Sequence, residues 1–168
     1  MSNRTVVGSK KSILFPLIPV DVWDFSVACY SIGEVKCACF DLQEHYGGSI
    51  GLILLLKFLD ETGITIRAGD WKRLVDAASV SEALIRDFRC LRRQLKYNAP
   101  ERVYQQSMGF ELQLEKHQQL DLLRRITPVK ILRKNAKRMP LTSKYCIQLT
   151  ANHLAPIFSR PMLDLNSS

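Results

Sequence analysis

Few residues in this sequence have the spacing that a catalytic or metal-binding site requires. Asp41 and His45 are four residues apart in a predicted helix, a spacing that can place two ligands on one metal ion. No second ligand pair follows at a suitable distance, so a surface or capping role is the preferred interpretation. Cys37 and Cys39 are two residues apart, and a helix turns such side chains about 200° from each other. We therefore predict structural roles for all four residues, with no metal and no cofactor.

The motifs of common enzyme classes are also missing. Glu111 and Glu115 share a helix face, but no Glu-x-x-His motif accompanies them, so the di-iron bundle pattern is not met. The sequence has no phosphate-binding glycine loop, nucleophile elbow or kinase signature. His45, His117 and His153 have no visible partner for acid–base chemistry. We predict no catalytic residue and favour a non-enzymatic protein, while an unrecognised enzyme stays open.

Positive charge is the strongest feature, and it is unevenly distributed. The net charge is +8, of which residues 1–120 contribute +1 and residues 121–168 contribute +7. This imbalance predicts a basic C-terminal tail that docks on an anionic partner, namely RNA, the ribosome or an acidic protein. A solubilising tail and a solvated helix face are the alternatives. The candidate anion-binding residues are Arg86, Arg89, Arg93, Lys96, Arg124, Arg125, Lys130, Arg133, Lys134, Lys137 and Arg138.

Apolar spacing indicates which elements would position these residues. It predicts an all-α, compact, single-domain bundle of about five to six helices. The predicted helices cover about residues 19–32, 34–46, 49–62, 70–78, 81–97 and 101–126. In this division, residues 1–18 form an extended N-terminal segment, 19–126 the helical domain and 127–168 the basic tail, with a short helix at 141–154 left open.

Two of these helices carry specific expectations. The helix at 49–62 is apolar almost all round, so we expect it to be the central buried one. In the helix at 81–97 and just before it, an apolar stripe spans about 80° of arc. We expect this stripe to face the core and the arginines to face solvent. The stripe residues are Val80, Leu84, Phe88, Leu91 and Leu95.

A second hypothesis concerns the first three helices. Trp23, Tyr30, Gln43 and Tyr46 could line a pocket between them, which would make the protein a small-ligand binder or an enzyme. A purely structural protein–protein module is the third hypothesis. The oligomeric state is left open by the sequence.

Cysteine use and hydropathy indicate a cellular location. Five cysteines, an odd number without a secretory signal, fit reduced thiols in the cytoplasm better than disulfides. The apolar run Leu52–Leu56 is interrupted by Lys57 and is too short to span a bilayer. We therefore expect a cytoplasmic protein that is not inserted in a membrane.

Several segments, taken in order, resemble one family. They are Trp23-Asp-Phe-Ser-Val-Ala-Cys-Tyr30, Cys37-Ala-Cys-Phe-Asp-Leu-Gln43, Tyr46-Gly47, Leu52-Ile-Leu-Leu-Leu56, Phe88-Arg-Cys-Leu-Arg-Arg-Gln-Leu-Lys96 and Glu111-Leu112 with Glu115. This order is similar to an uncharacterised family of small proteobacterial proteins over about residues 20–125. The resemblance implies an all-helical bacterial cytosolic protein and supplies no mechanism.

The chain departs from that family at two places. It has Ser49-Ile50-Gly51 where the family pattern has Asp-x-Asn, and Phe58 where the pattern has Trp. A family site built on that Asp and Asn would be impaired in this chain.

Overall fold

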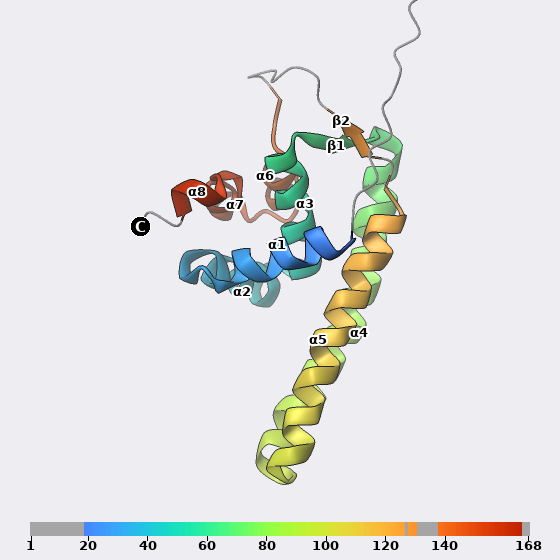
Figure 1. Ribbon diagram of the computed structural model, residues 1–168, viewed down its shortest axis with the longest axis vertical. Coiled ribbons are helices and arrows are strands. Elements are labelled where there is room, and N and C mark those ends of the chain that lie inside the picture. Colours follow the sequence, from blue (N-terminus) through green and yellow to red (C-terminus); the bar gives the residue numbers. More distant parts are fainter. Residues whose placement is uncertain (1–18, 127, 131–137, 166–168) are drawn as a thin grey trace, which may run out of the picture.

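The computed structural model describes residues 19–126, 128–130 and 138–165 of the 168-residue chain. The fold is all-α, as predicted, with one short strand pair (Figure 1). The elements are α1 (Pro19–Ser31), α2 (Gly33–Tyr46), α3 (Ile50–Thr62), β1 (Ile64–Ile66), α4 (Ala68–Asn98), α5 (Glu101–Arg124), β2 (Pro128–Lys130), α6 (Leu141–Gln148), η1 (Asn152–Leu154), α7 (Ala155–Ser159) and α8 (Met162–Leu165). The predicted segment 1–18 lies outside the described residues.

Helix α3 is the centre of the core, as its apolar sequence predicts. The Ser49 side chain caps it by accepting from the Leu52 N–H at 3.2 Å, and Gly63 ends it in the left-handed conformation at φ 67°. Leu52, Leu55 and Leu59 are fully buried. Helices α1, α2, α5 and α6 all pack on α3, so its burial holds the body of the protein together.

The C-terminal segment differs from the expected tail. From Leu141 onward the chain folds back onto α3 and α2, and Tyr145, Cys146, Phe158 and Leu165 belong to the core. Charge and proline content suggested a loose tail, but apolar residues spaced four apart give α6 a buried face. Residues 141–165 are therefore part of the compact body.

Two charged residues of α3 hold this segment in place. Asp60 accepts from the Leu141 N–H at 2.8 Å and from the Thr142 N–H at 3.0 Å, so it caps α6 from outside the helix. Burial raises the pKa of the Asp60 carboxyl, and these hydrogen bonds oppose that shift. Lys57, 1% exposed, donates to the carbonyl oxygens of Phe158 at 3.1 Å and Arg160 at 2.6 Å.

Helices α4 and α5 form a long antiparallel hairpin that extends away from the body (Figure 1). The break predicted near residues 78–81 is absent, because Ser81 donates its hydroxyl to the Ala77 carbonyl at 2.9 Å rather than capping a new helix. The strands β1 and β2 pair antiparallel at the base of the hairpin, with Ile66 opposite Pro128.

The predicted orientation of α4 is wrong. Val80, Leu84 and Leu91 are 75%, 65% and 50% exposed, while the buried face includes Glu82 and Arg89. Periodicity correctly locates an apolar stripe but does not say which face is covered. Here the polar face is turned inward because it meets complementary polar groups of α2 and α5.

We predict that Lys57→Met destabilises the protein by about 2–3 kcal/mol, because the carbonyl oxygens of Phe158 and Arg160 lose their donor and the partly buried Glu61 carboxylate loses its cation. Lys72→Met is the control, since the Lys72 side chain is 84% exposed, and it is expected to stay within about 0.5 kcal/mol of wild type. Urea unfolding followed by circular dichroism measures both. Equal stability of the two variants would contradict the role given to Lys57.

Candidate functional site

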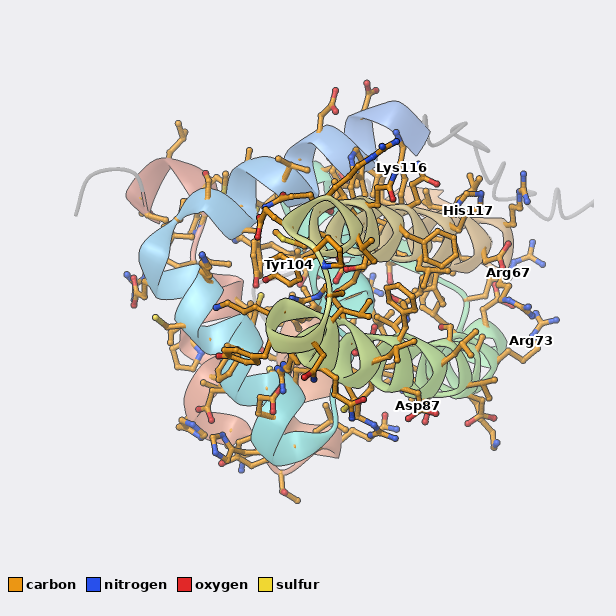
Figure 2. The ribbon with its side chains drawn as sticks, turned by 90° about the horizontal axis from the view of Figure 1, so that it is seen from below. Arg67, Arg73, Asp87, Tyr104, Lys116 and His117 are labelled. Atoms are coloured by element: carbon orange, nitrogen blue, oxygen red, sulfur yellow. The ribbon has the colours of Figure 1, made fainter. Side chains whose placement is uncertain are left out.

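A cavity of about 350 Å³ lies where α1, α2 and α3 meet the α4–α5 hairpin. Figure 2 looks from below, with α1 and α2 on one side of the hairpin. The apolar lining is Trp23, Val27, Phe40, Ile50, Leu54 and Leu112. The polar lining is Ser26, Tyr30, Gln43, Glu82, Arg89, Arg92, Arg93, Glu111, Glu115, Gln118 and Gln119. Such a mixture of an apolar wall and convergent polar groups is typical of small-molecule sites.

The guanidinium of Arg89 is the centre of the polar wall. Its side chain is 10% exposed, and it donates through Nε to Glu111 at 2.8 Å and through Nη2 to Glu115 at 3.0 Å. Glu82 Oε1 lies 3.7 Å from Arg89 Nη1. Burial alone would lower the pKa of Arg89, but the three carboxylates together raise it. Arg89 therefore stays charged and joins α4 to α5.

The network continues to both sides of Arg89. Glu111 accepts from Arg92 through its second oxygen, so one carboxylate bridges two guanidinium groups. Glu82 accepts from Gln43 Nε2 at 2.6 Å, which links α4 to α2. Gln118 Nε2 donates to Ser81 Oγ at 2.9 Å and lies 3.5 Å from Glu82 Oε2. These bonds fix the walls of the cavity relative to one another.

The hydrogen-bonding capacity of this polar wall is not fully used. Among the described residues, Arg89 Nη1 has no hydrogen-bond acceptor. The Glu115 side chain is 34% exposed, and burial raises the pKa of its carboxyl even though Arg89 opposes the shift. Burial also raises the pKa of the Tyr30 hydroxyl. Both groups thus hold their protons more tightly than they would in water.

The predicted pocket residues are partly brought together. Trp23, Tyr30 and Gln43 line the cavity, whereas Tyr46 packs its ring against His153 at a centroid distance of 5.6 Å. The sequence interpretation missed the contribution of α4 and α5. The signal was present in Glu111 and Glu115, which are four residues apart and face an arginine-bearing helix.

The predicted anion-binding residues are dispersed. Arg89 is buried among glutamates, and Arg93 lies 3.5 Å from Glu44. Arg86, Lys96, Arg124, Arg125 and Arg138 are exposed, and Arg138 donates to the Thr65 hydroxyl. The side chains of Lys130, Arg133, Lys134 and Lys137 lie outside the described residues. The face on α4 proposed from sequence is therefore not a continuous solvent-exposed row, because Arg89 faces inward.

The other candidate residues have surface or core positions. Asp41 is hydrogen-bonded to His153 at 3.0 Å and His45 at 2.7 Å, and these bonds lower the pKa of its carboxyl. Within the described part of the chain, no cluster of three or more His, Cys, Asp or Glu side chains is arranged to hold a metal ion. Cys37 is exposed and Cys39 is buried, and burial raises the pKa of the Cys39 thiol.

Of the three positions at which the chain departs from the expected family pattern, Gly51 lines the cavity, Ser49 contacts the lining residue Gln118, and Phe58 packs on Phe25 instead. Ser49 donates its hydroxyl to Gln118 Oε1 at 3.4 Å. A Cβ atom at Gly51 would lie 2.4 Å from the same Gln118 oxygen. A side chain at position 51 would therefore require Gln118 to move, and in this chain Gln118 occupies that space.

Comparison with known proteins places the chain in a family. A family model described as protein of unknown function, DUF2390, matches residues 21–122, which is more than half of the chain. The chain belongs to the DUF2390 family. The predicted relation to a family without an assigned function is thus confirmed. The DUF2390 match includes every residue that lines the cavity and ends before α6.

Other comparisons add no further relatives of this DUF2390 protein. No curated protein matches the chain, and no solved structure matches it either. Among the helices of the described residues, none combines the length and the apolar character needed to cross a bilayer.

We predict that Arg89→Met destabilises the protein by about 3–5 kcal/mol at neutral pH, because three carboxylates are left without their shared cation. Arg86→Met, on the exposed face of the same helix, is the control and is expected to change stability by less than about 0.5 kcal/mol. Urea unfolding of both variants gives the comparison.

The stability that Arg89→Met loses should also depend on pH. The Glu115 pKa is already raised by burial, and removing Arg89 takes away the charge that opposes this shift. A carboxyl with a raised pKa in the folded state contributes stability at low pH that is lost as pH rises through that pKa. The variant should therefore approach wild-type stability as the pH is lowered toward about 4. A deficit that stays constant with pH would contradict the buried network.

Proposed function

We propose that this protein binds a small, largely apolar molecule carrying a polar group, in the cavity between α1, α2, α3 and the α4–α5 hairpin. The observation that supports this most is a cavity of about 350 Å³ retained beside a buried network of charges. This volume is within the range of about 300–1,000 Å³ that small-molecule sites occupy.

The lining indicates how such a molecule would lie. Trp23, Val27 and Phe40 offer an apolar wall, and Leu112 adds to it from α5. The polar group would meet the opposite wall near Tyr30, Gln43 and the partly exposed Glu115 carboxyl group. This division favours an amphipathic ligand over a fully charged one.

The charged groups that line the cavity fit ligand binding better than catalysis. Glu111 uses both carboxylate oxygens on arginines, and Glu82 is held by Gln43. A general base needs an oxygen or nitrogen that can reach a substrate proton. Residues committed to one another are better suited to shaping and fixing the walls of a cavity than to moving protons.

A filling experiment tests the proposal. Val27→Phe with Leu112→Phe adds bulk from two walls of the cavity. The matched control, Ala28→Phe with Gln113→Phe, introduces two phenyl rings one residue further along each helix, at exposed positions that do not line the cavity. Trp71→Phe in every protein leaves Trp23 as the single tryptophan reporter. The probe is N-phenyl-1-naphthylamine, an uncharged aromatic amine, and the measurement is saturable quenching of Trp23 emission.

We expect the cavity-filling variant to lose affinity for the probe by about tenfold or more, equivalent to at least about 1.4 kcal/mol. The neighbouring variant should bind within about twofold of the reference. Equal quenching in both variants, or no saturable quenching in the reference protein, would exclude the cavity as the binding site.

We propose a second activity for one basic end of the molecule. Arg67 directly follows β1 and Arg125 lies three residues before β2, so the pairing of the two strands places both arginines at the same end of the hairpin. Arg138 is exposed and donates to the Thr65 hydroxyl in β1. Arg67, Arg125 and Arg138 define this basic end. Such a cluster favours contact with the phosphates of RNA, which presupposes a cytoplasmic protein.

The salt dependence of RNA binding tests the basic end. Phosphate contacts predict that affinity for a labelled RNA oligonucleotide falls by about tenfold or more between about 50 and 200 mM salt. Arg67→Gln with Arg125→Gln should weaken binding, whereas Arg86→Gln with Arg102→Gln removes the same charge elsewhere and should not. Fluorescence anisotropy measures each affinity. Equal loss in both double variants would show that net charge alone is responsible.

A further inference from the structure

One face of the hairpin carries an apolar row that the body of the protein does not use. The outer stripe, as we name it, consists of Val80, Leu84, Phe88 and Leu91 on α4 and Phe110 on α5. Val80, Leu84 and Phe110 are 75%, 65% and 50% exposed. The rings of Phe88 and Phe110 meet edge to face with centroids 5.1 Å apart, so the two helices share one continuous apolar surface.

The outer stripe faces away from the cavity. Glu82 and Arg89 belong to the opposite, buried face of α4, and α1 and α2 lie on that side of the hairpin (Figure 2). No element of the described residues covers the outer stripe, as the exposed fractions of its members show. A row of large apolar side chains of this length on a protruding helix pair marks an interaction surface.

One edge of this surface is acidic, and the other carries an arginine and a histidine. On α4, Asp76 and Asp87 flank the outer stripe on the side away from α5, at about 40° and 20° from Val80 around the helix. On α5, His117 and Arg124 flank it on the side away from α4, at similar angles from Phe110. Figure 2 shows Asp87 and His117 on the two different helices.

The positions of these residues along the axis of the hairpin also match. Contacts such as Arg89 with Glu111 and Gln118 with Ser81 pair α4 and α5 residues whose numbers add to about 200. By this register Asp76 is level with Arg124, and Asp87 is within about one helical turn of His117.

We propose that the outer stripes of two copies of this chain pack face to face, with a two-fold axis along the hairpin, to form a four-helix bundle. Under that symmetry α4 lies antiparallel to α5 of the other copy, so neighbouring helices alternate in direction as in common bundles. The acidic edge of one copy then meets the basic edge of the other. Asp76 faces Arg124 of the partner subunit and Asp87 faces His117 of the partner subunit.

A second copy of this chain fits both the apolar row and the charged edges of the outer stripe. An interface between identical copies must be self-complementary, and a stripe with an acidic edge and a basic edge at matching heights meets that condition. The four edge residues are exposed, and within the described part of the chain the ion pairs of Asp76 and Arg124 are exposed and lie in their own helices. They are therefore available to the second copy without disturbing the cavity.

The test is the mass of the full-length protein in solution. Sedimentation equilibrium at micromolar concentration should give a dimer for the wild type and a monomer for Leu84→Glu. Ile147→Glu is the control, because Ile147 is 47% exposed on α6, outside the outer stripe, and this variant should stay dimeric. Circular dichroism should show that all three proteins keep their helical content, since both substituted side chains are already exposed.

Charge exchange tests the register. Asp76→Arg alone and Arg124→Asp alone should each weaken the dimer by about tenfold or more, and the double variant should recover it. A wild-type monomer at all concentrations would overturn the proposal. It would also be overturned if removal of residues 1–18 created the dimer, because those residues would then be the natural cover. A dimer that Leu84→Glu leaves intact, or a double variant that stays as weak as the single ones, would exclude this arrangement.

Discussion

The guanidinium of Arg89 is nine-tenths buried, and a charge in that position has to be paired wherever the chain places it. Its partners stand on the neighbouring helix, where Glu111 and Glu115 are one turn apart. This requirement fixes both the register of the α4–α5 hairpin and its rotation about its own axis. With the polar face turned inward, the cavity acquires its charged wall and the apolar stripe is left outside.

The same principle holds the C-terminal part of the chain. Lys57 and Asp60 come from the most apolar helix of the protein, yet both are buried or partly buried and both find backbone partners in residues 141–160. Neither contact provides much net free energy by itself, since each group gives up water to make it. What the pair provides is specificity, because only one placement of α6 and α7 satisfies both side chains.

The sequence predicts well those features that depend on local chemistry. Gly47 and Gly63 both adopt positive φ, at 65° and 67°, and end α2 and α3 where the pattern indicated. The central position of α3 follows from its uniform apolar character. Three of the four residues proposed for a pocket line the cavity, because aromatic and polar residues on adjacent short helices are close in space whatever the rest of the chain does.

Features that depend on distant partners could not be predicted in the same way. Helix α4 has an apolar face and a charged face, and only knowledge of Glu111 and Gln43 opposite the charged face decides which is buried. The C-terminal helices are short, contain prolines and carry little periodic signal, so their burial depends on the surface that α3 offers them. Charge counting was misleading there, because the positive charge of residues 121–168 lies almost entirely at 124–138, whereas residues 141–165 carry a net charge of only +1.

A double-mutant cycle between Arg89 and Glu111 tests most directly whether the buried network organises this fold. The unfolding free energies of Arg89→Met, Glu111→Gln, the double variant and the wild type give the coupling between the two side chains, free of effects that each substitution has alone. The network described here predicts a coupling of about 2 kcal/mol. Additive effects, with a coupling near zero, would show that the two residues do not hold the hairpin in register.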